Sequence, residues 1–270
     1  MTLAATHNVT CKGSGPATLV FCHGFGCDQT MWRHIVPALS ARFKVVLFDL
    51  AGCGKSDLAA YDRDKYASLE GHASDVVAIT GQYGEGPVFF IGHSVGASIG
   101  MLAGVGHPAM FAGHVMVSPS PCYINHGDYV GGFNEDDIDA LLQLMDDNYD
   151  KWSASVAPMI MGAAGGQAMQ QELNDRFCRN DRAIARHFAR VTFRCDHRAL
   201  VPLLTDPVLV LQSSDDLIAP REVGEYMHRH LPRSRLQIIH NDGHCPHMTA
   251  PAAAAALIDG FILHCLGQAA

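Results

Sequence analysis

Apolar residues along the chain form short runs separated by amphipathic stretches. Six of these runs are apolar on both faces of an extended chain, at residues 16–22, 44–49, 87–91, 114–118, 207–212 and 235–240. Strands with this pattern belong to sheets that are covered by helices on both sides, and such sheets are mostly parallel. Residues 7–12 are expected to add an antiparallel strand at one edge. The pattern therefore predicts an α/β fold.

The alternation stops after Tyr123, and residues 134–193 contain helical patterns but no strand. Apolar positions recur there in four groups, at 138, 141, 142 and 145, at 152, 156, 159 and 160, at 169, 173 and 177, and at 184, 188 and 191. The later groups are separated by glycines at 162, 165 and 166 and by the Asn-Asp pair at 180 and 181. We predict a core of residues 1–123 and 194–270, with a four-helix cap of residues 124–193 over the C-terminal edge of the sheet.

The segment Gly92-His93-Ser94-Val95-Gly96 lies between an apolar run and small residues suited to a close-packed helix. G-x-S-x-G alone recurs by chance, but a strand before it and a helix after it are typical of a nucleophile elbow. Such a turn lifts the serine hydroxyl above the sheet beside a base, and the two glycines leave room for it. Ser94 is therefore the predicted nucleophile.

Two adjacent carboxylates, Asp215 and Asp216, follow the apolar run at residues 207–212. They are expected at the carboxyl end of a strand, where the catalytic groups of open α/β sheets gather. One of them is expected to hold a histidine in the correct tautomer and to stabilise it when charged. The pattern does not choose between the two, and the other would be a solvated carboxylate in a turn.

A histidine after the last expected strand completes the order Ser-Asp-His that follows such an elbow in hydrolases. His244 is expected to take the proton from Ser94. His240 and His247 are alternatives. His240 lies within the expected strand and His247 follows a proline, where a helix start is expected, so the pattern favours His244.

The loop after the first long run contains His23-Gly24-Phe25-Gly26 and precedes an amphipathic stretch. Its glycines let the backbone approach a bound carbonyl oxygen. We expect the backbone N–H groups of Phe25 and Val95 to form an oxyanion hole that stabilises the tetrahedral intermediate. The alternative is a plain turn at this position.

Five segments resemble the RsbQ-like family of α/β hydrolases, which includes a bacterial stress-signalling hydrolase and is related to the plant strigolactone and karrikin receptors. They are residues 23–29, 48–57, 92–96, 118–123 and 243–248. The similarity spans about residues 6 to 266, and the segments Ser-Pro-Ser-Pro-Cys-Tyr and Gly-His-Cys-Pro-His are more specific than the elbow.

The resemblance implies an α/β-hydrolase fold with a cap, and a triad acid at Asp216, directly before an apolar residue. It also implies a substrate pocket formed by Phe25, Phe133, Trp152, Val156, Phe193 and Leu217. The implied substrate is a small apolar ester or lactone of the butenolide kind. The implied protein partner is a PAS-domain phosphatase.

Composition agrees with one large α/β unit and narrows the range of partners. The chain has 270 residues, 48% of them hydrophobic, and a net charge of −8, which argues against a nucleic-acid surface. The apolar run at residues 252–258 is expected to be too short to span a bilayer. The N-terminus shows no signal-peptide pattern, and nine cysteines without a C-x-x-C pair indicate reduced thiols, so we expect a cytoplasmic location.

Three other motifs are incomplete. Residues 51–56 end like a phosphate-binding loop, but its first glycine would fall at Asp49, and Gly24-x-Gly26 lacks a third glycine at position 29. His244 and His247 with Asp242 could imitate a metal site but lack a fourth ligand. We therefore expect no cofactor and no metal.

Three functions fit these residues. The first is a slow hydrolase that senses a small molecule and signals to a protein, and the second is a metabolic esterase without a partner. The third is a binding-only receptor on a hydrolase scaffold, and a complete triad argues against it.

Overall fold

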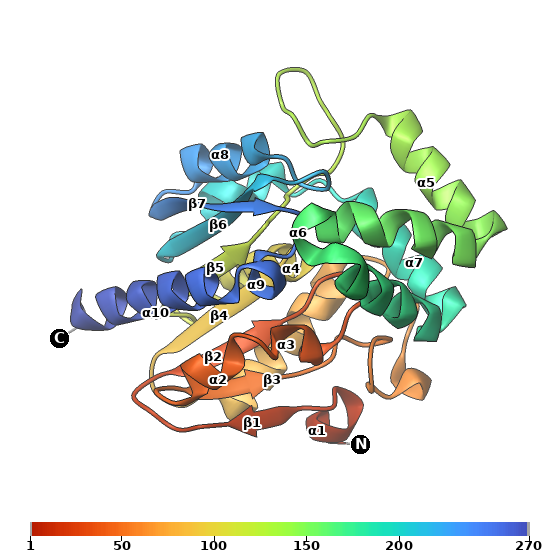
Figure 1. The fold of residues 1–270 in the computed structure, drawn as a ribbon. Helices are drawn as coiled ribbons and strands as arrows, with labels where there is room; N and C mark the ends of the chain where they lie inside the picture. The colour runs from red at the N-terminus through yellow and green to blue at the C-terminus, as the bar shows by residue number, and fades with distance from the viewer. Residues whose placement is uncertain (1, 269–270) are drawn as a thin grey trace.

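The strands form one seven-stranded sheet in the order β1-β3-β2-β4-β5-β6-β7 in the computed structural model, which describes residues 2–268 (Figure 1). Their bounds are Thr10–Lys12 (β1), Thr18–Cys22 (β2), Lys44–Leu47 (β3), Val88–His93 (β4), Gly113–Val117 (β5), Val208–Asp215 (β6) and Ser234–Asp242 (β7). β1 is antiparallel to β3, and all other neighbours are parallel. The predicted α/β fold with a mostly parallel sheet is confirmed.

The sheet is covered on both faces because its strands are apolar at successive positions. In β2, Leu19 and Phe21 point into one core cluster, whereas Val20 and Cys22 point into another. All five residues of this strand are fully buried. A central parallel strand of this kind needs a helical layer on each side.

The helices supply those two layers. Their bounds are Leu3–Thr6 (α1), Val36–Ser40 (α2), Leu69–Tyr83 (α3), Val95–Gly106 (α4), Glu135–Asp147 (α5), Tyr149–Arg179 (α6), Arg182–Phe193 (α7), Arg221–His230 (α8), Pro246–Thr249 (α9) and Pro251–Gln268 (α10), with 3-10 turns at Gln29–Trp32 (η1), Leu58–Ala60 (η2) and Arg198–Leu203 (η3). The apolar residues of α3, α4 and α8 pack on one face of the sheet, and those of α2 and α10 pack on the other.

The helices α5, α6 and α7 lie together beyond the tips of the central strands (Figure 1). Gly162 and Gly166 interrupt α6 with non-helical backbone, so this element consists of two helical arms, as the glycines in the sequence predict. The segments that lead into and out of these helices lie side by side, as the β-bridge between Cys122 and Asp196 shows.

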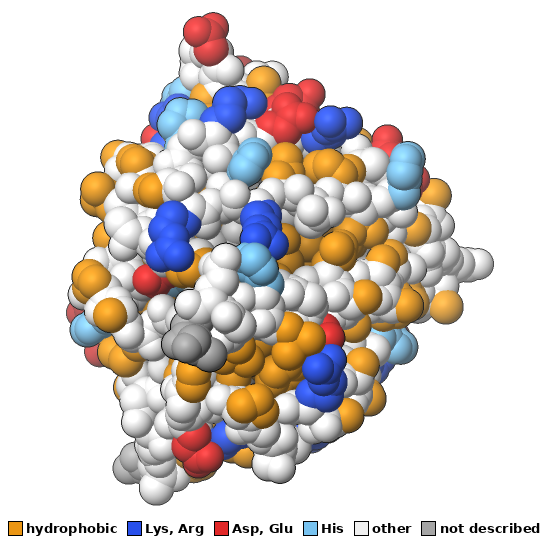
Figure 2. All heavy atoms as spheres, turned by 90° about the vertical axis from the view of Figure 1, so that its left-hand side faces the viewer, with side chains coloured by type: hydrophobic (Ala, Val, Ile, Leu, Met, Phe, Trp, Pro, Cys, Tyr) orange, Lys and Arg blue, Asp and Glu red, His pale blue; other side chains and the backbone are white. Residues whose placement is uncertain are grey.

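The C-terminal helix α10 is longer than the apolar run at residues 252–258. It has 18 residues with a mean hydropathy of 1.2, which by length and composition alone would allow it to cross a membrane. One face, with Ile258, Phe261 and Ile262, packs against the sheet, as in the core helix of a globular fold. Its other face is open, and Figure 2 shows hydrophobic side chains among charged ones on the side where α10 ends.

Candidate active site

Ser94 lies in the sharp turn between β4 and α4. Its backbone has φ 55° and ψ −124°, a left-handed conformation that is strained for any residue with a Cβ atom. The flanking glycines are required by close backbone contacts. A Cβ at Gly92 would lie 2.5 Å from the carbonyl oxygen of Gly96, and a Cβ at Gly96 would lie 2.6 Å from those of Cys22 and His23.

His244 is held by Asp216. The Nδ1 atom of His244 lies 2.8 Å from Oδ2 of Asp216, and the two side chains are 3% and 0% exposed. The other carboxylate oxygen accepts hydrogen bonds from the N–H groups of Ile218 and Ala219 at 2.9 and 3.0 Å, which stabilise its negative charge. The Nε2 atom of His244 has no hydrogen-bond partner among residues 2–268, and the imidazole lines the same cavity as Ser94.

Asp215 and the alternative histidines lie elsewhere. The side chain of Asp215 is exposed and accepts a hydrogen bond from the hydroxyl of Ser214 at 2.7 Å. His240 is exposed on β7, and His247 is buried in α9. The geometry thus brings Asp216 and His244 together, the pair that the resemblance implies.

The two expected oxyanion donors lie beside the serine. Val95 directly follows Ser94, and the loop of Phe25 is close, since a Cβ on Gly24 would lie 3.4 Å from the Cβ of Ser94. Within the described part of the chain, the backbone N–H groups of Phe25 and Val95 donate no hydrogen bond. Both are therefore free to bind the oxygen of a substrate carbonyl.

Tyr123 is a candidate active-site residue that the patterns in the sequence did not identify. Its hydroxyl lies 3.2 Å from Oγ of Ser94, and its ring packs edge-on against Phe193 at 5.4 Å. Burial raises the pKa of this phenol well above its usual value, so it stays protonated and can donate to the serine. In the sequence, Tyr123 is marked only by its place at the end of residues 118–123, one of the five segments that resemble the RsbQ-like family.

An apolar cavity of about 40 Å³ lies over these groups. The lining includes four of the six residues expected at the substrate: Phe25, Phe133, Val156 and Phe193. Other wall residues come from the cap helices and from the loop after β6: Leu141, Met159, Ile160, Leu173, Thr192 and Ile218. Ligand pockets have volumes of about 300–1,000 Å³, so this cavity is too small for a typical ligand in the conformation described.

Two expected pocket residues do not line the cavity. Leu217 is 64% exposed, because the hydrogen bonds that Asp216 accepts turn the loop so that Ile218 points inward instead. Trp152 is fully buried one layer behind the wall, where its ring packs edge-on against Phe25 at 6.1 Å between centroids. The family resemblance implied Trp152 as a pocket residue, and helical spacing gave it only as part of an apolar stripe, which does not show in which layer the side chain lies.

The site therefore contains the groups that acyl transfer requires: a hydroxyl, an imidazole nitrogen without a partner beside the same cavity, and two free N–H donors.

The sequence model of the alpha/beta hydrolase family matches residues 19–257. The chain is 37% identical over 259 residues to karrikin insensitive 2 receptor CA of Petunia hybrida, with 96% of each chain covered. It is 32% identical over 251 residues to a strigolactone esterase of Pisum sativum, covering 92% of this chain and 93% of the other.

A solved structure gives the same result. A hydrolase from Oleispira antarctica superposes with a TM-score of 0.93 at 39% identity, covering 97% of this chain and 96% of the other.

Proposed function

The chain belongs to the alpha/beta hydrolase family and is a hydrolase of the esterase type; on that premise, we propose that it cleaves a small apolar ester or lactone through Ser94, His244 and Asp216. The observation that carries this assignment is the 2.8 Å contact between Asp216 and His244, whose second imidazole nitrogen is unpaired within the described residues and whose side chain lines the same cavity as Ser94. A serine hydroxyl needs such a base to become a nucleophile.

The proposed reaction has two halves. In the first, Nε2 of His244 accepts the proton of Ser94 while Oγ bonds to the carbonyl carbon, and the N–H groups of Phe25 and Val95 hold the oxyanion. The tetrahedral species then expels the leaving oxygen, which takes the proton from His244. In the second half a water molecule repeats these steps and releases the acid from Ser94.

The proposed substrate class rests on the cavity wall and on the relatives. Phe133, Val156 and Phe193 offer apolar contacts and no charge, which suits a small apolar ester or lactone. Relatives at 32–37% identity are named strigolactone esterase and karrikin receptor, which supports a butenolide-like lactone as substrate.

We further propose that turnover is slow and that the protein acts as a cytoplasmic sensor. The support is the small volume of the cavity, since movement of the cap of residues 124–193 would make room for a substrate. The surface of the moving cap would then report occupancy to a protein partner, which the RsbQ-like resemblance suggests is a PAS-domain phosphatase. The alternative is a metabolic esterase with the same chemistry and no partner.

The nucleophile is tested with Ser94→Ala and p-nitrophenyl acetate. We expect kcat to fall by at least about 1,000-fold with an unchanged thermal midpoint, and a serine-reactive phosphonate to label Ser94 alone. An alanine variant that keeps its activity would exclude Ser94 as the nucleophile.

The sensor is tested by hydrogen exchange with a butenolide lactone. We expect slow turnover and a ligand-dependent change in exchange at residues 135–193. Fast turnover of many simple esters without any change in cap exchange would support the metabolic esterase.

A further inference from the structure

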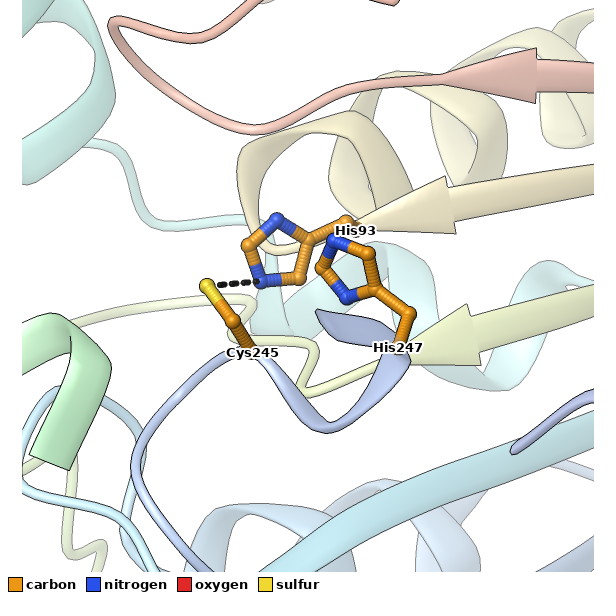
Figure 3. A group of neighbouring side chains, drawn as sticks. All are labelled: His93, Cys245 and His247. Carbon is orange, nitrogen blue, oxygen red and sulfur yellow. Dashed lines mark hydrogen bonds between the residues drawn. The ribbon is translucent and has the colours of Figure 1, made fainter. Parts of the chain in front are cut away.

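A second group of reactive side chains lies beside the nucleophile and takes no part in the proposed reaction, although two of its members, His93 and Cys245, also line the cavity of Ser94. His93 ends β4, Cys245 immediately precedes α9, and His247 lies within α9 (Figure 3). Their exposed fractions are 3%, 0% and 0%. One ligand atom from each residue lies within 4.8 Å of the other two, and Figure 3 shows the thiol and both rings turned toward one another.

The imidazole of His247 has no hydrogen bond on either nitrogen within the described residues. It is enclosed by rings, with centroids 4.5 Å from Trp32 and 4.5 Å from His93. A buried polar group without a partner destabilises the fold, and such groups in native proteins call for a bound water, an ion or a chemical role.

The spacing of the other two residues suits a shared metal ion. Nε2 of His93 lies 3.8 Å from Sγ of Cys245. A metal ion lies about 2.1 Å from a nitrogen ligand and about 2.3 Å from a sulfur ligand. With an angle of about 120° between these two bonds, the nitrogen and the sulfur are about 3.8 Å apart. A neutral imidazole has one nitrogen lone pair to offer to a metal ion, and His93 and His247 each supply such a ring.

We propose that His93, Cys245 and His247 form a binding site for one Cu(I) ion. Cu(I) prefers soft ligands such as a thiolate and also binds imidazole, and its single charge is neutralised by the thiolate. Zn²⁺ would leave a net positive charge in a dry interior and would look for a fourth ligand, and the groups found in residues 2–268 supply three.

An ordinary cysteine thiol is protonated at neutral pH, so Cu(I) that binds Sγ of Cys245 displaces that proton into solvent. Nε2 of His93 lies 2.9 Å from the carbonyl oxygen of His244 and donates to it when the proton is on Nε2. Copper on Nε2 requires the proton to move to Nδ1, which has no partner in the described chain.

Copper binding would therefore break a hydrogen bond that fixes the backbone of His244. The imidazole of His244 would lose part of its support, and hydrolysis at Ser94 would slow. Copper would act as an inhibitor here, whereas the binding itself does not depend on the proposed hydrolase chemistry.

The test uses the whole chain with its exposed thiols removed, Cys11→Ser with Cys178→Ser, because these would bind Cu(I) on the surface. The protein is titrated without oxygen with Cu(I) held by bicinchoninate, and retained copper is counted. We expect one ion per chain, an X-ray absorption spectrum with one sulfur and two nitrogen ligands, and an affinity that rises about tenfold per pH unit because one proton is released. Adding Cys245→Ser or His247→Asn should weaken binding by at least about tenfold.

The matched control is a second grouping, Cys122, His126 and Asp196. Asp196 already accepts hydrogen bonds from Arg198 at 2.8 and 2.6 Å, and the Cys122 thiol donates to the carbonyl of Ile124. His126→Asn should leave copper binding unchanged. In the variant without the exposed thiols of Cys11 and Cys178, one equivalent of copper should lower the rate of ester hydrolysis. When Cys245→Ser is added to that variant, the hydrolysis rates with and without copper should agree.

Should Cys245→Ser fail to fold by circular dichroism, Cys245→Ala and His247→Asn carry the same comparison. The proposal is overturned if no copper is retained, if the Cys245 and His247 variants retain it equally well, or if His126→Asn abolishes it.

Discussion

The backbone N–H of His244 donates a 2.7 Å hydrogen bond to the carbonyl oxygen of Ile160 in α6. The loop that carries the proposed base is thus bonded to the helix that covers it. The two backbones also touch beside this bond, since a Cβ on Gly162 would lie 2.4 Å from the carbonyl oxygen of Asp242. Movement of α6 at this point must therefore displace the imidazole.

Gly162→Ala tests this contact, with Gly166→Ala as its matched control. Both glycines have a φ of 60° with ψ near 180°, so backbone strain should cost each alanine about 1–3 kcal/mol of stability, but a Cβ on Gly166 meets nothing within 4 Å. Only Gly162→Ala pushes on Asp242 and hence on His244. We expect kcat on p-nitrophenyl acetate to fall about 100-fold more for Gly162→Ala than for Gly166→Ala. Equal losses would show that the contact does not position the imidazole.

Asp216→Asn and Asp215→Asn separate the two adjacent carboxylates. The amide at position 216 would favour the wrong tautomer of His244, and kcat should fall by about 1,000- to 10,000-fold. Asp215 contributes only its backbone carbonyl to this region, accepting from the N–H of Gly243 at 2.7 Å, so its side chain should be dispensable. Steady-state kinetics would reassign the role if Asp215→Asn were the more damaging change.

Tyr123→Phe removes the hydroxyl that lies 3.2 Å from Oγ of Ser94 but keeps the ring against Phe193. A hydrogen bond of this kind is worth about 1 kcal/mol, so we expect kcat to change about fivefold. Tyr129→Phe is the control, because its hydroxyl donates to the backbone carbonyl of Cys122 instead. The idea fails if the two variants have the same kcat.

Stability should fall in mild acid because of buried neutral histidines. His72 is fully buried, and desolvation lowers its pKa to about 3, whereas an unfolded histidine titrates near 6.5. Between these values the unfolded state holds the extra proton, so the free energy of unfolding should decrease by up to about 1.4 kcal/mol per pH unit below about pH 6.5 for each such residue. Urea unfolding at pH 7, 6 and 5 should show a shallower decrease in His72→Phe. His240→Phe, at an exposed position on β7, should keep the original slope.

The sheet could be predicted because its signals are local. Apolar runs mark the strands, and the glycines around Ser94 are required by backbone contacts that any elbow of this shape makes. Gly162 and Gly166 similarly mark the breaks in α6, where the backbone is left-handed. The antiparallel edge strand β1 lies within residues 7–12, where the sequence pattern predicted it.

The cavity wall could be predicted only in part because it depends on contacts between distant segments. Ile218 rather than Leu217 faces inward on account of hydrogen bonds to Asp216, and the spacing of residues does not show these. Tyr123 lies 29 residues from Ser94 on an irregular segment, so no periodicity links the two. Patterns along the chain identify faces of helices and strands, but they do not identify neighbours across a loop.

The left-handed backbone of Ser94 bears on how such a protein could lose its chemistry over generations. Glycine adopts this conformation without strain, so Ser94→Gly should release stability that the serine withholds, of the order of 1 kcal/mol. A chain that used the cavity only to hold a ligand would lose nothing by this exchange. A serine kept in a strained turn therefore points to a use for its hydroxyl.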